Sequence, residues 1–197
     1  MANERKRGSE LEVAILEAAF EILQTSGYEN MTFQNVAKRA QTSRTVLYRR
    51  YETKVNLLHA LIRYKSKRAL GGNMIDLLQD KGSLRGNLLT VVQLYQQFFE
   101  AVGPEILSAM VFELSQKKEL FQQFGERARE SNFIMMKKIQ HFAKQNGEIN
   151  HEFTPMQMSL PFDLLRFENL IRGGNVSEEY LIKLVDEVLM PIYSGEK

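Results

Sequence analysis

Apolar residues recur at helical spacing along nearly the whole chain, and no alternating pattern of strand length appears. The first helix is expected to start at Ser9, which has capping-box spacing to Glu12, and to end at Gly27. One face of this helix is apolar, through Leu11, Ile15, Ala18, Ala19, Ile22 and Leu23. The pattern therefore predicts an all-α protein.

Residues 32–54 contain two short helical patterns on either side of a tight break at Gln41 and Thr42. Thr32 is the expected N-cap of the first helix, and the second is expected from about Ser43 to Tyr51. The positions predicted to face the core are Phe33, Val36, Ala37 and Ala40 in the first helix and Val46 and Leu47 in the second. Two short helices, the second basic and aromatic, are typical of a DNA-reading helix-turn-helix.

Capping residues, prolines and glycines predict the remaining helices. Thr53 is expected to cap a long helix that continues through Leu57 and Leu61 toward Leu78. Further helices are predicted at residues 83–102, 104–115, 118–145, 155–172 and 177–193. We therefore expect about nine helices in two domains, a three-helix N-terminal domain over residues 1–54 and a helical C-terminal domain over residues 55–197. No flexible linker separates the two, so the boundary is expected inside the helix that follows Thr53.

The composition excludes several classes of chemistry. The chain has no cysteine, which excludes disulfides, Cys-based zinc sites and a thiol nucleophile. Its three histidines, His59, His141 and His151, lie in separate segments, and no glycine-rich phosphate loop occurs. An enzyme is therefore not expected, and neither a cofactor nor a metal is predicted. No apolar run approaches the ~18 residues of a spanning helix, which favours a cytoplasmic protein.

Positive charge is concentrated in one part of the chain. The whole chain carries a net charge of +2, but residues 31–68 contain ten Lys or Arg against one acidic residue, Glu52. That segment is therefore +9, and the rest of the chain is −7. A charge asymmetry of this kind directs one end of a molecule toward a polyanion, although a solvated basic helix surface would give the same count.

The residues of this segment and its surroundings resemble the DNA-binding domain of the TetR (tetracycline-repressor-like) transcriptional regulators. The residues that carry the resemblance are Ile15 to Ala19, Gly27-Tyr28, the pair Ala37 and Ala40, Ser43 with Leu47-Tyr48, and Lys54 with Leu57-Leu58. A looser resemblance to one group of TetR ligand domains rests on Ser83 to Gly86, Gly147-Glu148, Leu160 to Arg172 and Glu178 to Leu181. Two positions depart from the usual pattern, since Gln41 replaces a glycine and Thr45 replaces a glycine or proline.

The candidate DNA contacts follow from physics and from this resemblance. Arg44 and Thr45 are expected at the exposed start of the recognition helix, where base edges are read. Thr32 and Lys54 are expected to hold phosphates at helix N-termini. The complete predicted set is Thr32, Thr42, Ser43, Arg44, Thr45, Tyr48, Arg49, Arg50 and Lys54. Tyr51 is expected in the core, Tyr48 has a core position as its alternative, and Arg5 to Arg7 are either a minor-groove arm or a solubilising tail.

The resemblance also implies a small hydrophobic effector bound within the C-terminal helices. The candidate pocket residues are Phe98, Phe99, Met110, Glu113, Phe133, Met136, Phe162 and Arg166. The apolar ones could equally be ordinary core, and Glu113 and Arg166 could form ion pairs between helices. By resemblance, the last two helices, at about residues 155–172 and 177–193, form a four-helix bundle with a second subunit.

Together these observations predict a homodimeric, sequence-specific DNA-binding regulator. The expected activity is repression, relieved when a small-molecule effector releases the protein from a palindromic operator. The alternative is a protein of the same fold that acts through protein partners with weak or no specific DNA binding, which Gln41 and Thr45 leave open.

Overall fold

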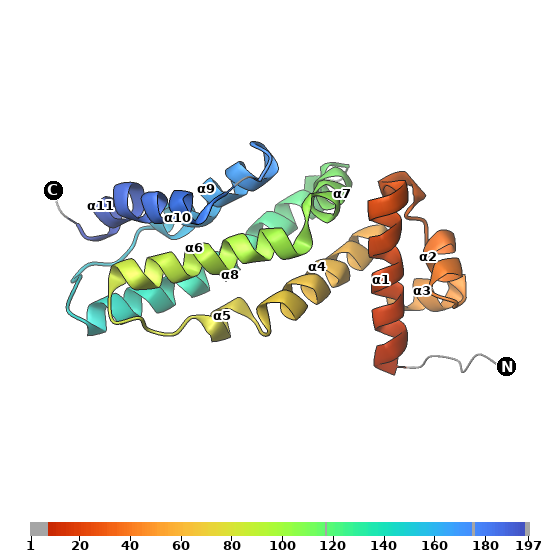
Figure 1. The fold of residues 1–197 in the computed structure, drawn as a ribbon, viewed down its shortest axis with the longest axis horizontal. Coiled ribbons are helices and arrows are strands. Elements are labelled where there is room, and N and C mark those ends of the chain that lie inside the picture. The colour runs from red at the N-terminus through yellow and green to blue at the C-terminus, as the bar shows by residue number, and fades with distance from the viewer. Residues whose placement is uncertain (1–7, 117, 175, 196–197) are drawn as a thin grey trace. The chain divides into compact units, whose positions relative to one another are not determined.

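The computed structural model describes residues 8–116, 118–174 and 176–195, and within these ranges it contains helices and no strand. The described residues form two compact units. Unit 1 comprises those within 1–66 and 105–117, and unit 2 those within 67–104 and 118–197. The chain first passes from unit 1 to unit 2 between Ser66 and Lys67, inside a helix. Figure 1 labels the elements in chain order.

Unit 1 begins with α1 (Gly8–Ser26), which starts one residue before the predicted position. Gly27 ends it with φ 77°, a left-handed backbone that glycine adopts without steric cost, and a short 3₁₀ turn, η1 (Tyr28–Asn30), follows. The predicted apolar face is confirmed, with Leu11 half-buried at its edge. The buried residues of α1 are Ile15, Leu16, Ala18, Ala19, Ile22 and Leu23. Burial of this face holds α1 against α2.

Two capped short helices come next, α2 (Phe33–Arg39) and α3 (Arg44–Arg50). Thr32 Oγ1 accepts a hydrogen bond from the Asn35 amide at 3.1 Å, as predicted. Ser43 Oγ accepts one from the Val46 amide at 3.3 Å, which makes it the N-cap of α3. The predicted inward positions of α2 are all buried, and Leu47 is fully buried in α3. Val46 was wrongly expected in the core and is only half-buried, because Leu47 alone fills the inward position of this two-turn helix.

The turn between α2 and α3 keeps a left-handed residue although it has no glycine. Gln41 has φ 55°, and it is the only non-glycine residue with a positive φ among the described residues. Its amide bonds to the Lys38 carbonyl at 3.3 Å, and the Thr42 amide bonds to the Ala37 carbonyl at 2.9 Å. These two bonds make a Schellman motif, in which glycine is the usual residue at the Gln41 position. The turn shape is therefore retained at the cost of local strain.

Replacing Gln41 with glycine should stabilise the protein by about 0.5–1 kcal/mol. Relief of a left-handed non-glycine backbone is worth ~1–2 kcal/mol, against ~0.5–1 kcal/mol for the greater freedom of glycine in the unfolded chain. Urea unfolding of wild type, Gln41→Gly and Gln41→Ala would measure this, with Gln41→Ala expected to keep the strain. A Gln41→Gly protein less stable than wild type would show that the contacts of the Gln41 side chain outweigh the strain.

Helix α4 (Lys54–Leu70) is shorter than predicted. Its N-terminus is capped as expected, since Thr53 Oγ1 accepts a hydrogen bond from the Asn56 amide at 3.2 Å. The expected continuation to Leu78 is wrong, because Gly71 takes φ 73° and ends the helix. A separate short helix, α5 (Met74–Leu77), follows. The apolar periodicity continued across this break and concealed it.

The remaining helices lie close to their predicted positions. They are α6 (Leu84–Val102), α7 (Pro104–Ser115), α8 (Lys118–Gln145) and α9 (Pro155–Leu170). The last predicted helix is interrupted, as α10 (Glu178–Lys183), a π-helical turn η2 (Leu184–Leu189) and α11 (Met190–Tyr193). Pro191 has no N–H to bond the Glu187 carbonyl, and the Met190 amide bonds to the Val185 carbonyl instead, five residues back.

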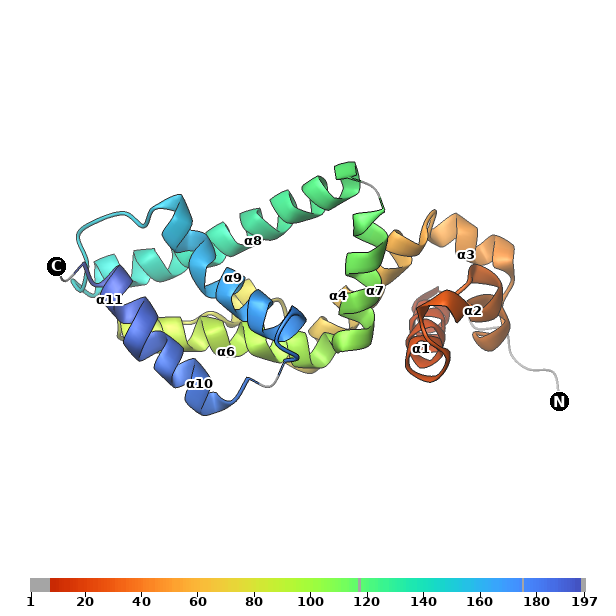
Figure 2. The same ribbon diagram turned by 90° about the horizontal axis from the view of Figure 1, so that it is seen from above.

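Unit 2 is organised around α6. It contacts α8, α9, α10 and η2, and Figures 1 and 2 show α9 and the α10–α11 segment on the same side of α6 and α8. The core contributed by α6 includes Leu84, Leu88, Val91, Val92, Tyr95 and Phe99. None of the helices in the described part of the chain is long and apolar enough to cross a bilayer.

Candidate nucleic-acid interface

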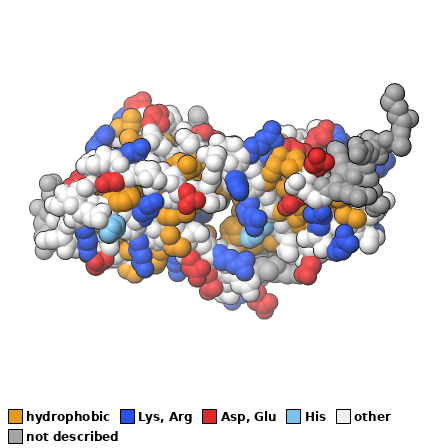
Figure 3. Space-filling view, turned by 90° about the horizontal axis from the view of Figure 1, so that it is seen from below, with side chains coloured by type: hydrophobic (Ala, Val, Ile, Leu, Met, Phe, Trp, Pro, Cys, Tyr) orange, Lys and Arg blue, Asp and Glu red, His pale blue; other side chains and the backbone are white. Residues whose placement is uncertain are grey.

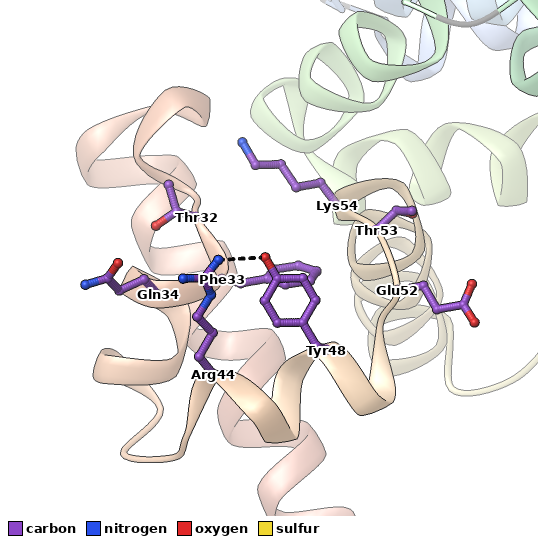
Figure 4. A pocket seen from close by; sticks show the side chains of 8 residues that line it. All are labelled: Thr32, Phe33, Gln34, Arg44, Tyr48, Glu52, Thr53 and Lys54. Carbon is purple, nitrogen blue, oxygen red and sulfur yellow. Dashed lines mark hydrogen bonds between the residues drawn. The ribbon is translucent and has the colours of Figure 1, made fainter.

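A groove of about 420 Å³ lies on unit 1 where α2, α3 and the start of α4 meet (Figure 4). Its lining residues are Thr32, Phe33, Gln34, Arg44, Tyr48, Glu52, Thr53 and Lys54. Four of the predicted DNA contacts therefore line one concave surface, namely Thr32, Arg44, Tyr48 and Lys54. They come from three helices that are separated in sequence and are brought together by the fold.

An arginine–tyrosine pair on α3 forms the centre of the groove. Arg44 Nη2 donates a hydrogen bond to Tyr48 Oη at 3.0 Å, and the guanidinium carbon lies 5.2 Å from the centre of the tyrosine ring. The buried Phe33 meets the same ring edge-on, with ring centres 4.7 Å apart. Tyr48 is 46% exposed, which excludes its core alternative. Phe33 thus fixes the position of the Tyr48 ring, and the hydroxyl and face of that ring orient the Arg44 guanidinium.

The other predicted contacts lie outside the lining of this groove. Ser43, Thr45, Arg49 and Arg50 are exposed, and Thr42 is half-buried. The Ser43 hydroxyl is used as the α3 cap. Thr45 lies in the first turn of α3 beside Arg44, whereas Arg49 and Arg50 occupy its last turn. The exposed side chains remain accessible to a ligand larger than the groove itself.

Gln34 lines the groove but is absent from the predicted set. It is an exposed residue in the first turn of α2, two positions after the N-cap Thr32. A capped helix N-terminus favours anions, so this spacing was the signal that could have identified Gln34. Glu52 also lines the groove, and Figure 4 draws its carboxylate pointing away from Arg44.

The fold uses part of the basic segment for its own contacts. Arg39 Nε donates to Glu21 Oε2 at 2.6 Å, and this bond lowers the pKa of the Glu21 carboxyl. The Lys65 ammonium lies 3.6 Å from the centre of the Phe20 ring. On the face drawn in Figure 3, basic side chains occur beside acidic ones. The charge count of the sequence therefore overstates the cations free to meet a polyanion.

Tyr51, at the end of α3, lies in the core as predicted, with 6% of its surface exposed. Its hydroxyl is buried without a hydrogen-bond partner among the described residues, and burial raises the pKa of this phenol. An unsatisfied buried polar group costs ~1–3 kcal/mol. The buried Tyr51 hydroxyl therefore lowers the stability of unit 1.

Tyr51→Phe should raise the free energy of unfolding by about 0.5–1 kcal/mol, since it removes an unsatisfied hydroxyl and leaves only a small void. Tyr193→Phe is the matched control, because the buried Tyr193 hydroxyl donates a hydrogen bond to the Gln157 carbonyl. That variant should lose about 1 kcal/mol. Thermal and urea unfolding of the two variants and of wild type would give the sign of each change in the free energy of unfolding. Equal destabilisation by the two substitutions would contradict the expectation.

The predicted effector residues divide between the two units. Met110 and Glu113 belong to unit 1, where the Tyr28 hydroxyl donates a hydrogen bond to Glu113 Oε1. Phe98, Phe99, Phe133, Met136, Phe162 and Arg166 belong to unit 2. The eight residues predicted to line one effector pocket therefore do not form a single cluster within either unit.

Unit 2 contains an aromatic cluster with one cation at its edge. Phe99 and Phe162 meet Tyr95 edge-on, with ring centres 5.0 and 4.9 Å away. Arg166 donates to Tyr95 Oη at 3.2 Å and to Asp163 Oδ1 at 2.6 Å. Both charged candidates, Arg166 here and Glu113 in unit 1, therefore have protein partners. Arg5, Lys6 and Arg7 lie outside the described residues.

Comparison with known proteins assigns the chain to a family. Residues 15–61 match the tetR family of bacterial regulatory proteins, and residues 78–188 match the tetracyclin repressor-like C-terminal domain. A relative from Mycobacteroides abscessus, named DNA-binding transcriptional repressor TetR, is 22% identical over 93% of this chain and 94% of its own. An uncharacterised HTH-type transcriptional regulator of Mycobacterium tuberculosis is 26% identical over 91% of this chain and 86% of its own.

Solved structures show the same fold. A chain from Mesorhizobium loti, described as a TetR-family transcriptional regulator, aligns with a TM-score of 0.66 at 17% identity, over 95% of this chain and 97% of that one. Another from Rhodococcus sp. aligns with a TM-score of 0.62 at 19% identity, over 94% of this chain and 99% of that one. The match to the repressor-like C-terminal domain alone spans more than half of the sequence. The chain therefore belongs to the TetR family of bacterial transcriptional regulators, which are DNA-binding proteins and not enzymes.

Proposed function

We propose that this regulator is a homodimeric repressor that reads a palindromic operator with α3 and is released from it by a small-molecule effector. The observation that carries the proposal is the Arg44–Tyr48 pair, exposed at the start of α3 and lining a groove with Thr32 and Lys54. A recognition helix presents its N-terminal residues to base edges, and arginine bidentate to guanine is the commonest specific contact.

The roles of the groove residues follow from their chemistry. Arg44 reads guanine, and Tyr48 contacts a thymine methyl through its ring or a phosphate through its hydroxyl. Thr32 and Lys54, at the N-termini of α2 and α4, hold phosphates on either side. Thr45 supplies both a hydroxyl and a methyl beside Arg44, and Arg49 and Arg50 reach the DNA backbone.

Dimerisation is supported by an apolar stripe along α9 and its C-cap Ile171, in which Met156, Phe167 and Ile171 are exposed and Leu160 and Leu164 are half-buried. Met156, Leu160, Leu164, Phe167 and Ile171 follow one another at intervals of three or four residues, which places them on one face of the helix. Met156 is 82% exposed and Ile171 70%. Val188 and Ile192 are partly exposed apolar residues of the α10–α11 segment, which Gln157 of α9 contacts through a hydrogen bond to the Ile192 carbonyl. Large apolar side chains exposed along one helix face indicate an interface.

Two-fold pairing through this patch would place two α3 helices on one duplex. Dimeric helix-turn-helix proteins bind half-sites about one helical turn apart, so the operator is expected to be palindromic. Repression is proposed because the relative from Mycobacteroides abscessus is named a transcriptional repressor and matches nearly the whole length of this chain.

An effector would act through helix α4. The aromatic cluster around Tyr95 in unit 2 provides apolar surface, and Arg166 provides a polar group at its edge. Because α4 is continuous across the boundary between the units, a shift of α4 would change the separation of the two recognition helices. A coupling of ~1–3 kcal/mol suffices to alter operator affinity by one or two orders of magnitude.

Selection of bound fragments from a random duplex library, at one fixed moderate salt concentration, tests the proposal. A palindromic motif that contains a guanine in each half-site is the expected result. Salt-sensitive binding without any sequence preference would contradict it, and a role through protein partners would then become the better explanation.

A further inference from the structure

Tyr28 in η1 joins three elements of unit 1. Its hydroxyl donates a hydrogen bond to Glu113 of α7, and its ring meets the Phe112 ring edge-on at 5.6 Å. The Lys54 ammonium, at the first position of α4, lies 4.5 Å from the centre of the same ring. One aromatic side chain thus connects α7 to a residue of the DNA-reading groove.

Lys54 lines two grooves at once. One is the groove of Arg44 and Tyr48, and the other, of about 810 Å³, contains Tyr28, Phe112 and Glu113. Figure 4 shows the Lys54 side chain extended from α4 across the mouth of the first groove toward α2. The ammonium can therefore rest on the Tyr28 ring and still face a ligand in the first groove.

The contacts around Tyr28 fix its ring rather than merely bury it. Burial and the Glu113 carboxylate both raise the pKa of Tyr28, so the phenol stays protonated and keeps donating to Glu113. Phe112 restricts the ring from a second side. An ammonium held over an aromatic face keeps N–H groups for a further acceptor, because the ring engages only one side of it.

We propose that Tyr28 is a positioning residue for DNA binding, which with Glu113 and Phe112 of α7 holds the Lys54 ammonium where it meets an operator phosphate. The proposal rests on the proposed function, since it assigns Lys54 a phosphate. A free lysine side chain has many rotamers, and restricting them before binding reduces the entropy lost on binding. Helix α7 then influences operator affinity without touching DNA.

The sign of the effect at Glu113 makes the proposal testable. Removing an acidic residue near a DNA-binding surface should by itself strengthen binding to a polyanion. The proposal expects Glu113→Ala to weaken operator binding instead, by about twofold to fivefold for each subunit, as for loss of an exposed cation–π contact. Glu113→Gln carries the same change of charge but keeps an oxygen that accepts from Tyr28, so it should bind more tightly than Glu113→Ala.

A double-mutant cycle with Lys54 separates positioning from structure. Operator affinity and its salt dependence would be measured for wild type, Tyr28→Leu, Glu113→Ala, Lys54→Ala and each of the first two combined with Lys54→Ala. Lys54→Ala should lower the salt slope by about one for each subunit, or about two for the dimer. In that background neither Tyr28→Leu nor Glu113→Ala should weaken operator binding any further.

The outcomes distinguish this proposal from the function on which it rests. Absence of any operator preference in the wild type would overturn the proposed function. Normal operator binding with Glu113→Ala at least as tight as wild type would overturn only the positioning role, as would losses that persist in the Lys54→Ala background. Tyr28→Phe, which keeps the ring, replaces Tyr28→Leu in the cycle if thermal unfolding shows that the leucine variant is not folded.

Discussion

Ile171→Glu is expected to dissociate the dimer and to reduce operator affinity by at least about 100-fold. Ile171 is 70% exposed at the end of the apolar stripe on α9, where Phe167 precedes it. In a two-fold interface each substitution occurs twice, so two carboxylates would be buried without partners, at several kcal/mol each. Loss of the second half-site removes an avidity of ~10²–10⁴.

Sedimentation at micromolar concentration would measure the dimer, and binding to full and half operators would measure the affinity. Ile134→Glu is the matched control, because Ile134 is 57% exposed on α8 in the same unit but lies outside the stripe. That variant should remain dimeric. If Ile171→Glu also sediments as a dimer, the interface is elsewhere, and dissociation of Ile134→Glu would point to α8.

Arg44→Ala is expected to cause the largest loss of sequence discrimination. A bidentate arginine–guanine contact is worth ~1–3 kcal/mol, and a dimer has two, so specific affinity should fall by roughly 30-fold or more. Arg44→Lys should restore little of it, because lysine lacks the planar fork that matches guanine and that Tyr48 orients in this groove.

The comparison that decides the role of Arg44 is between operator and scrambled duplex. Arg49→Ala is the control, since Arg49 is exposed on the same helix outside the groove. It removes the same charge and should weaken both DNAs alike. Arg44→Ala should weaken the operator much more than the scrambled duplex. Equal losses on both would mean that Arg44 contacts phosphate and that the bases are read by other residues.

Helix starts were predictable from the sequence because each depends on one local hydrogen bond. A serine or threonine hydroxyl accepts from the amide three residues later, which needs no distant part of the chain. The structure has this bond at Thr32, Ser43, Thr53, Ser83, Thr154 and Ser177. The all-α class and the family follow from the same local patterns.

Helix interruptions were harder to predict, because they can leave apolar periodicity intact. Leu78 is buried and continues the spacing of α4, yet Gly71 ends that helix well before it. Gln41 shows the converse, since a residue that disfavours the left-handed turn adopts it, held by the hydrogen bonds of its own amide and of the Thr42 amide. In both cases the backbone of a single turn decided the outcome, and apolar periodicity does not report it.

The sequence by itself determined the all-α class, the helix starts with their caps, the family resemblance and the residue types available to bind DNA. Only the tertiary structure decided which of those residues share one surface. It pairs Arg39 with Glu21, places Lys54 over the Tyr28 ring, and brings Glu113 to Tyr28 across 85 residues of chain. Periodicity reports which face of a helix is apolar, whereas contacts between side chains far apart in sequence depend on how those faces pack.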